Sequence, residues 1–586
     1  MNNSIKKIYT NQHITSNFMV LSIILIAFFS YRDMLDYFFT SGDDLIFITY
    51  GRIQSFKDII NILTKTQYSE QSLFYRPIAV LSFSLDYSIW KLNPFGYHLT
   101  NLIIHIVVSI LVFFLVRLLT GGKQVIAWLS SIIFTTHPIL IHNVTVSGNR
   151  PDMITALFLI LSLLLFLKHV SSVSHKRCFL LSSIFFYVLA FGTKEIAIIL
   201  LPLIFTYLII FTDEMSPVVR VGQAIKRTTP YFITTLILVA WRAYVLKGLV
   251  GGYSFVEGSR HIIILKYFNM LLNPADFLRL LTPATEIFVL PLSLLFISLI
   301  FYKRIISENG YIRTIKKLLM TGLILSSISI LTYLLIEQKN GTGHQLLMRI
   351  MEGLNITSLK NYIGSSRKLF LKAPYFLLFF FMTCLMGIAN YEKRKYFFPV
   401  SYKGKLITFL LIWLLLPLSV YVYTLYFSRW YMYIPVIPFS IILSVMFIEG
   451  LKSPRSSLLK RIAVPAMIAV LILSFFLYSP FRTIRGWKPS VKTASMLLDR
   501  LLEIVPELPK GTTIFIYNVP QNVMNISGYG IKLWLDLIYP ANNVKAISLN
   551  LVPPVKTIPD HLDFEMQTDE NNNTKINVIL RTKSGK

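Results

Sequence analysis

The sequence predicts an α-helical polytopic membrane protein that ends in a small soluble domain. Hydrophobic residues occupy 54% of the 586 positions and charged residues 15%, and the mean hydropathy is +0.61. This composition excludes a disordered chain, a collagen-like fibre and a disulfide-stapled secreted module. The two cysteines, Cys178 and Cys384, supply neither a disulfide framework nor a thiolate metal site.

Thirteen segments are candidates for membrane spans, because a spanning helix needs about 20 mostly apolar residues. They are roughly 17–31, 96–118, 124–142, 153–168, 178–192, 195–211, 229–246, 286–302, 318–336, 371–390, 406–424, 432–450 and 462–479. Lys6 and Lys7 precede the first segment, and no small-residue cleavage site follows it. We therefore expect an anchor rather than a removed signal.

The basic residues predict the side of each loop. The formal net charge is +29, and Lys and Arg concentrate in the cytoplasmic loops of membrane proteins. With the N-terminus in the cytoplasm, the basic clusters within 303–317, 391–405 and 451–461 also lie there. The short outer loops then carry only Arg150, Lys194 and Arg429. The positive charge thus indicates contact with anionic lipid rather than nucleic acid.

The first external loop is expected to run from 32 to 95. Residues 77–90 are apolar, but a span there would place every later basic loop outside, so we expect an interfacial or re-entrant helix. Segment 44–66 is expected to form a helix lying on the membrane surface. Its apolar face would comprise Leu45, Ile48, Ile59, Ile60 and Ile62.

The composition becomes more polar after the last predicted span. Strand-like runs occur at 513–518, 544–549 and 575–581, separated by Pro, Gly and Asn. This pattern predicts a small extracytoplasmic α/β domain over 480–586. Residues 1–479 then form the membrane domain.

Asp43 and Asp44 are the candidate catalytic residues. They follow the first predicted span by about a dozen residues, where adjacent carboxylates can serve as a general base and as the group that orients an acceptor hydroxyl. Crowded carboxylates also raise the pKa of one member of the pair. The structural alternative is an acidic turn that caps a helix beginning at Leu45.

Candidate substrate-binding residues lie at the predicted outer ends of the spans. They are Tyr75, Arg76, His137, Arg150, Asp152, Lys194, Glu195, Arg429 and Tyr433. The four cations among them suit a phosphate-bearing donor. The alternatives are a headgroup anchor at Arg76, mutual ion pairs of Arg150 with Asp152 and of Lys194 with Glu195, and an aromatic belt around Tyr433.

The ordered set of motifs resembles one family. The motifs are Asp43-Asp44, Tyr75-Arg76-Pro77, Asn93 to His98, His105, His137-Pro138, Gly148 to Asp152, Thr193-Lys194-Glu195 and Arg429 to Pro435. Together they are similar to the membrane region of the O-mannosyltransferases that carry transmembrane and tetratricopeptide repeats, within the GT-C glycosyltransferase superfamily. The resemblance covers roughly residues 15–480, and no tetratricopeptide pattern is found in the sequence.

The resemblance implies an inverting GT-C glycosyltransferase. It would transfer a sugar, mannose in the family, from polyprenyl phosphate to a protein or glycan acceptor on the extracytoplasmic side. By analogy with the superfamily Asp43 would be the base and Asp44 its neighbour, although the sequence alone does not order them. No cofactor is expected to be required, and a divalent cation held by the two carboxylates is the alternative. The expected location is a prokaryotic plasma membrane.

Three other functions stay open on the sequence. A ligase or polymerase of lipid-linked oligosaccharides would need a larger outer cavity, formed by loops 247–285 and 337–370. A lipid or glycan transporter would usually carry ionisable residues near the midplane of the bilayer, whereas the predicted spans hold few, chiefly His105 and Arg242. A scaffold without catalytic activity would tolerate the loss of both Asp43 and Asp44.

Overall fold

The computed structural model describes the N-terminal half of the chain and parts of the rest. The described residues are 2–248 without 40, 68–73, 173–174 and 213–216, then 401–451 without 425–427, then 513–517, 529–539, 545–549, 561–568 and 574–581, with scattered residues at 267, 271 and between 488 and 503. Two compact units are found. The first holds residues 1–205, 216–255 and 433–586, and the second holds 206–215 and 256–432.

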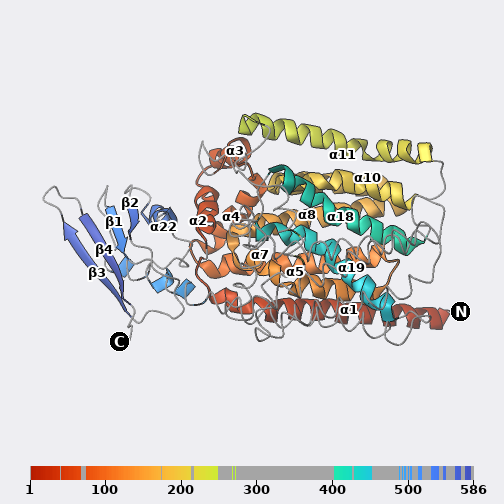
Figure 1. The fold of residues 1–586 in the computed structure, drawn as a ribbon, viewed down its shortest axis with the longest axis horizontal. Coiled ribbons are helices and arrows are strands. Elements are labelled where there is room, and N and C mark those ends of the chain that lie inside the picture. The colour runs from red at the N-terminus through yellow and green to blue at the C-terminus, as the bar shows by residue number, and fades with distance from the viewer. Residues whose placement is uncertain are drawn as a thin grey trace, which may run out of the picture. The chain divides into compact units, whose positions relative to one another are not determined.

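Long apolar helices dominate the described residues (Figure 1). Seven are long and apolar enough to cross a membrane. They are α1 (Asn2–Tyr31), α5 (Pro94–Leu119), α8 (Arg150–Ser171), α9 (Lys176–Thr193), α11 (Pro217–Leu246), α18 (Tyr402–Thr424) and α19 (Tyr433–Leu451). Each of them contains one of the predicted spans or most of it. An integral, multi-pass membrane protein is therefore supported.

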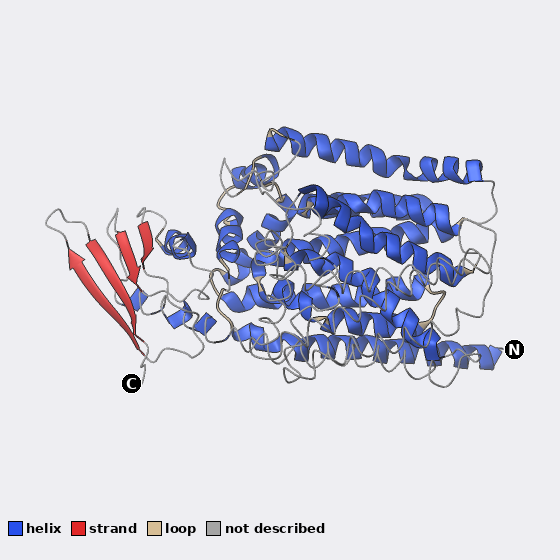
Figure 2. Ribbon diagram, viewed as in Figure 1, coloured by secondary structure: helices blue, strands red, loops and turns tan. Residues whose placement is uncertain are grey.

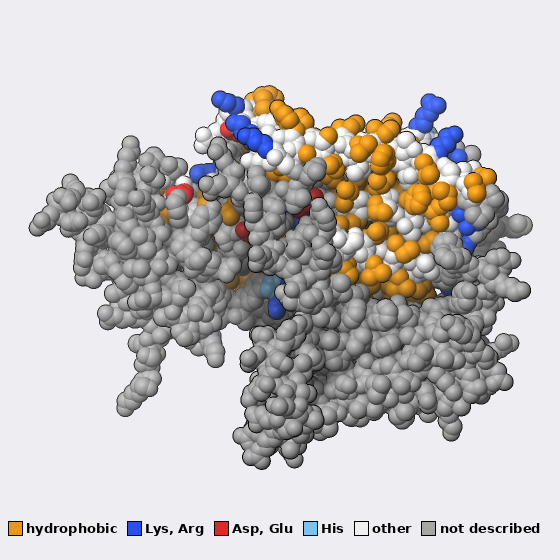
Figure 3. Space-filling view, turned by 45° about the horizontal axis from the view of Figure 1, so that its top comes forward, with side chains coloured by type: hydrophobic (Ala, Val, Ile, Leu, Met, Phe, Trp, Pro, Cys, Tyr) orange, Lys and Arg blue, Asp and Glu red, His pale blue; other side chains and the backbone are white. Residues whose placement is uncertain are grey.

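The surface of these helices agrees with that assignment. Large hydrophobic side chains of α11, among them Val218, Phe232, Ile233 and Ile237, are exposed. Figure 3 shows hydrophobic side chains spread over the described surface and Lys and Arg side chains gathered toward its two ends. An apolar band between two charged rims is the pattern that a lipid bilayer covers.

Some predicted spans differ or fall elsewhere. Residues 195–211 form a 3₁₀ turn (Glu195–Ile199) followed by α10 (Leu200–Phe211), a shorter apolar helix. The predicted spans 286–302, 318–336, 371–390 and 462–479 lie outside the described residues, as do most of loops 247–285 and 337–370. The total of thirteen spans and the sidedness of the loops stay predictions.

The predicted span 124–142 is not one straight helix. It divides into α6 (Gln124–Thr136), a 3₁₀ turn (Pro138–Leu140) and α7 (Ile141–Thr145), with a bend of 48° at the break. Proline has no N–H to continue the helical ladder and pushes the preceding residue into extended backbone. His137 adopts that conformation, with φ −63° and ψ 121°.

The segment 44–66 is also not one surface helix. It contains α2 (Gly42–Gly51) and α3 (Phe56–Thr64), because Ser55 and Asp58 form a capping box that starts a second helix. Leu45 and Ile48, expected on an apolar face against lipid, are buried inside the protein. Helix α4 (Pro77–Trp90) covers the predicted interfacial segment, and its 14 residues are too few for a span.

Helix α5 supplies a buried polar stripe to the membrane core. Asn93 caps it and Pro94 occupies its first turn. Tyr97, Asn101, His105 and Ser109 recur every fourth residue, and all are buried. Within this stripe, His105 contacts the Tyr433 hydroxyl on α19 and the Thr135 carbonyl on α6. The polar groups therefore link helices instead of facing lipid.

The described C-terminal residues include a four-stranded sheet, drawn in red in Figure 2. Its strands are β1 (Thr513–Tyr517), β2 (Lys545–Leu549), β3 (His561–Thr568) and β4 (Thr574–Arg581), in the order β2-β1-β4-β3. β1 is parallel to β2 and β4, whereas β3 is antiparallel to β4. β1, β2 and β4 coincide with the predicted runs, and α22 (Tyr529–Ile538) lies between β1 and β2 in the sequence. The boundary at residue 480 stays a prediction.

Candidate active site

The acidic pair lies in the first turn of α2, where the two carboxylates have different environments. Ser41 caps the helix, and its Oγ accepts a hydrogen bond from the backbone N–H of Asp43 at 3.2 Å. The Asp44 carboxylate returns a bond to the cap, because its Oδ2 accepts from the Ser41 N–H at 3.0 Å. Asp44 is thus the acidic member of a capping box and is fully buried.

Gly148 closes the other side of Asp44. Its backbone N–H donates to Oδ1 of Asp44, so both carboxylate oxygens of this residue accept backbone hydrogen bonds. A Cβ on Gly148 would lie 2.6 Å from the Asp43 Cβ and 3.0 Å from the Asp44 nitrogen. Only glycine allows the turn at Ser147–Asn149 to approach α2 this closely.

Asp43 is the accessible member of the pair. Its side chain is exposed, and within the described part of the chain its carboxylate accepts no hydrogen bond and forms no ion pair. Dense protein surroundings nevertheless desolvate it and raise its pKa above the ordinary value, while the charge of Arg76 acts in the opposite direction. The structural alternative predicted for the pair therefore holds for Asp44, and Asp43 is the member whose side chain is exposed.

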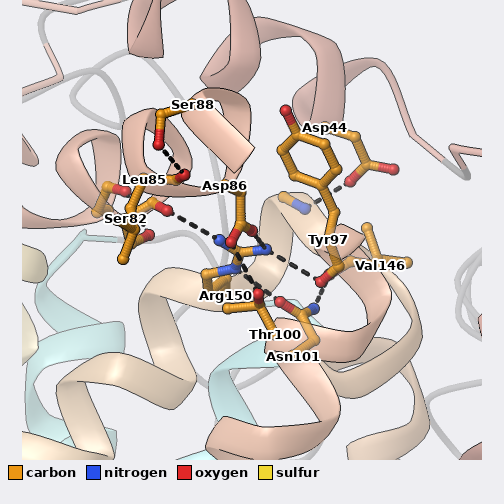
Figure 4. A network of polar contacts seen from close by, with 12 residues as sticks. Asp44, Ser82, Leu85, Asp86, Ser88, Tyr97, Thr100, Asn101, Val146 and Arg150 are labelled. Carbon is orange, nitrogen blue, oxygen red and sulfur yellow. Dashed lines mark hydrogen bonds and ion pairs between the residues drawn. The ribbon is translucent and has the colours of Figure 1, made fainter. Parts of the chain in front are cut away.

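Arg150 is held by a buried network (Figure 4). Its guanidinium pairs with Asp86 at 2.6 Å and donates to Oδ1 of Asn101 at 2.7 Å and to the Tyr97 carbonyl at 3.1 Å. It also stacks over the Phe83 ring, 4.1 Å from the ring centroid. The alternative pairing of Arg150 with Asp152 is therefore wrong. The network ties α4, α5 and the start of α8 together.

Asp152 pairs instead with Lys194. The ammonium nitrogen lies 2.7 Å from both carboxylate oxygens, and both side chains are almost completely buried. Asp152 is thus the salt-bridge partner of Lys194, and the charge of Lys194 also acts on the neighbouring Glu195. Breaking a buried pair of this kind typically costs about 3–5 kcal/mol.

Glu195 faces two arginines. Its carboxylate lies 3.7 Å from Arg76 and 3.6 Å from Arg242, so two positive charges converge on one negative charge. Both separations exceed the usual hydrogen-bond range of about 2.7–3.2 Å. The two contacts with Glu195 are therefore longer than the contact between Lys194 and Asp152.

Tyr75 joins the segments that carry these charges. Its hydroxyl donates to the Leu63 carbonyl at 2.6 Å and accepts from the Trp241 indole at 2.8 Å. Its own carbonyl accepts from Arg242 at 3.2 Å. The end of α3, the start of α4 and the end of α11 thus meet beside Glu195.

Two of the remaining candidates, His137 and Tyr433, are buried, and the third, Arg429, is exposed. His137 is buried at the break after α6, where its Nδ1 accepts from the Ile139 N–H. Tyr433 is buried against His105, with 2.8 Å between the hydroxyl and Nδ1. Arg429 is exposed in the second unit, at the start of a 3₁₀ turn (Arg429–Met432). Among the described residues, no group of three or more His, Cys, Asp or Glu side chains could hold a metal ion.

Asp86 and Arg242 are the site residues that the sequence did not identify. Asp86 lies within the long predicted external loop, and its partner Arg150 follows 64 positions later in the chain. Arg242 was noted only as a charge in an apolar span. A buried charge on an apolar helix needs a partner. This expectation could have identified Arg242 as a site residue from the sequence.

Part of this chain is similar in sequence to known proteins. Residues 77–245 match the family model described as dolichyl-phosphate-mannose-protein mannosyltransferase. The chain is 38% identical over 100 residues to the human protein O-mannosyl-transferase TMTC2, covering 17% of this chain and 12% of that protein. It is 29% identical over 181 residues to the Xenopus laevis protein O-mannosyl-transferase tmtc2, covering 29% and 21%. The predicted resemblance to O-mannosyl-transferases is confirmed over this part of the chain.

Two solved structures align with this chain at low TM-scores. The archaeal oligosaccharyltransferase AglB from Archaeoglobus fulgidus, in complex with an inhibitory peptide and a dolichol-phosphate, aligns with a TM-score of 0.42 and 11% identity over 91% of this chain and 64% of that one. ArnT from Cupriavidus metallidurans, bound to undecaprenyl phosphate, aligns with a TM-score of 0.36 and 14% identity over 90% and 88%.

The sequence match is partial. This chain spans about a fifth of the Xenopus relative and less of the human one. Both are animal proteins, so the prokaryotic plasma membrane stays a prediction. The matched part of the chain runs from the start of α4 nearly to the end of α11 and includes Arg150, Asp152, Lys194, Glu195 and Arg242.

Proposed function

We propose that this chain is a membrane glycosyltransferase of the GT-C type, which transfers a sugar from polyprenyl phosphate to an acceptor hydroxyl with Asp43 as the general base. The observation that carries the proposal is the division of roles within the acidic pair. Asp44 is buried with both oxygens engaged, whereas Asp43 is exposed on the same helical turn. The similarity to named O-mannosyl-transferases supports mannose as the sugar and protein as the acceptor.

The proposed reaction uses this arrangement. Asp43 removes the proton of the acceptor hydroxyl as its oxygen attacks the anomeric carbon of the sugar. The new glycosidic bond forms on the face opposite the phosphate, the bond from the anomeric carbon to the phosphate oxygen breaks, and polyprenyl phosphate leaves with the electron pair. A raised pKa suits this role, because a base works best when its pKa lies nearer the working pH.

Arg76 and Arg242 are proposed to face the donor phosphate. They converge on the single carboxylate of Glu195, and Arg76 is also the cation whose charge acts on Asp43. Phosphate oxygens would attract both guanidiniums, and positive charge beside the departing phosphate stabilises the transition state. Phosphate is an adequate leaving group without protonation, so no general acid is assigned.

Arg150 and Lys194 are proposed to position the site through the protein. Each already has a buried carboxylate partner at 2.6–2.7 Å, and exchanging that partner for phosphate would leave a buried charge unpaired. Direct donor contacts by Arg429, His137 and Tyr433 stay predictions, as do a divalent cation at Asp43 and the outer location of the site.

The test is transfer by the full-length chain in nanodiscs. Given radiolabelled polyprenyl-phosphate mannose and a peptide or glycan acceptor, the protein should form labelled acceptor and release unlabelled polyprenyl phosphate. The Asp43→Asn chain should form neither product. Movement of the labelled lipid across a vesicle membrane without transfer, equal in both chains, would contradict the proposal and favour a transporter.

A further inference from the structure

The chain just before α2 is held by aromatic contacts. His98 Nε2 donates to the Phe38 carbonyl at 3.3 Å, and the Phe39 ring packs edge-on against Tyr97 with centroids 5.4 Å apart. Phe38 and Phe39 precede the Ser41 cap by three and two residues. The two rings thus lie just before the cap and the first turn of α2.

Helix α22, from the C-terminal part of the chain, closes over these two rings. Trp534 is 6% exposed, and its ring lies edge-on to Phe38 with centroids 5.0 Å apart and tilted to Phe39 at 5.9 Å. Leu533, Leu535 and Leu537 of α22 belong to the same apolar cluster as Leu45, Ile46, Phe47 and Ile48 of α2. A helix far along the sequence thus packs directly on the helix that carries Asp43.

We propose that Trp534 is a positioning residue for the transfer reaction, because its packing on Phe38 and Phe39 fixes the start of α2 and hence the place of Asp43. This inference rests on the proposed function and extends it to the C-terminal part of the chain. The Asp43 carboxylate accepts no hydrogen bond from other described residues. Its position therefore depends on the helix beneath it.

Residues from two distant parts of the sequence contact the N-terminal end of α2 and the residues just before it. Gly148 binds Asp44 directly, and Trp534 supports the residues that lead into the cap. Loss of the indole ring would leave a void beside Phe38 and Phe39, into which the segment can relax. A displacement of the base by about 1 Å lowers a transfer rate by up to about a hundredfold.

The experiment compares Trp534→Ala with two other variants of the full-length protein in nanodiscs. Trp534→Phe keeps an aromatic ring in the same place, and Phe166→Ala removes a fully buried ring from α8, away from α2. We measure kcat and donor KM with polyprenyl-phosphate mannose, and hydrogen exchange of the amides of residues 42–51. Trp534→Leu, which keeps apolar volume, replaces Trp534→Ala if the latter does not fold.

Trp534→Ala should lower kcat about ten- to a hundredfold, leave donor KM within about twofold and speed exchange in α2. Trp534→Phe should restore most of kcat, and Phe166→Ala should leave kcat and α2 exchange near wild type. Wild-type kcat and exchange in Trp534→Ala would overturn the inference, as would an equal loss in Phe166→Ala. Full activity of Asp43→Asn would instead refute the proposed function, and the exchange rates would still report whether Trp534 holds α2.

Discussion

The close approach of Gly148 to α2 makes Gly148→Ala an informative perturbation. The new Cβ would lie 2.6 Å from the Asp43 Cβ and 2.9 Å from its carbonyl carbon, whereas ordinary contacts begin at 3.4 Å. Two of the three nearest atoms belong to backbone, which cannot rotate away, so the turn and the helix must separate by about 0.8 Å. The movement displaces Asp43 and stretches the bond from the Gly148 N–H to Asp44.

The expected cost has two parts. A base displaced by about 1 Å loses up to about a hundredfold in rate, and a weakened helix cap costs about 1 kcal/mol of stability. Donor affinity should change little, because the contacts that Arg76 and Arg242 make with Glu195 and Tyr75 lie outside this turn. Single-turnover transfer, donor binding and thermal unfolding in nanodiscs measure the three quantities.

The control is Gly222→Ala on α11, where an added Cβ meets nothing within 4 Å. It should leave the transfer rate unchanged, since alanine also favours helix over glycine. If Gly148→Ala transferred sugar at the rate of Gly222→Ala, the close packing of the turn on Asp43 would have no catalytic consequence. The expected link between the displacement of Asp43 and the transfer rate would then be refuted.

Activity should fall on the acid side, because Asp43 acts as a base only when ionised and its pKa is raised by desolvation. The charge of Arg76 lowers the pKa of Asp43, so Arg76→Gln should move the acid limb of a kcat–pH profile to higher pH. An acid limb at the wild-type pH would show that Arg76 does not act on the catalytic base. Arg242→Gln should weaken donor binding in a titration with polyprenyl phosphate about tenfold or more, a loss of at least about 1.4 kcal/mol, whereas wild-type affinity would exclude a phosphate contact. In a chain lacking Cys178 and Cys384, labels at Gly310→Cys and Phe398→Cys should report the cytoplasm and Asp560→Cys the exterior, and an external label at position 310 would contradict the predicted topology.

The hydrophobic pattern predicted the described helices well because apolar length alone decides whether a segment can span a membrane. The placement of the basic loops, and not the apolar pattern, separated α4 from the spans, since a crossing at 77–90 would have put every later basic loop outside. Local chemistry was harder to read. Pro138 marks the break after His137, and the capping box of Ser55 and Asp58 marks the start of a new helix. Both signals are present in the sequence, but the continuous apolar pattern around each of them predicted a single helix.

The site was predicted as a set of residues and not as a set of pairs. Asp43, Arg76, Lys194 and Glu195 were named, but Asp152 pairs with Lys194 across 42 positions and Arg150 with Asp86 across 64. Such pairs depend on which helix ends meet, and a single sequence does not contain that information. For the same reason the sequence did not predict the contact of Arg242 with Glu195 or the packing of α22 on α2. The strand β3 was missed because its charged residues are poor strand formers, although they alternate with apolar ones.

The central claim is that Asp43 is the base and Asp44 its structural neighbour, and single-turnover transfer by Asp43→Asn and Asp44→Asn tests it most directly. Asp43→Asn should lose about 10²–10⁴ in rate while its thermal unfolding and donor affinity stay near wild type. Asp44→Asn should be less stable by about 1–3 kcal/mol, because one of the two backbone N–H groups that Asp44 accepts from loses its partner. Wild-type turnover in Asp43→Asn, or a rate loss confined to Asp44→Asn without loss of stability, would contradict the assignment.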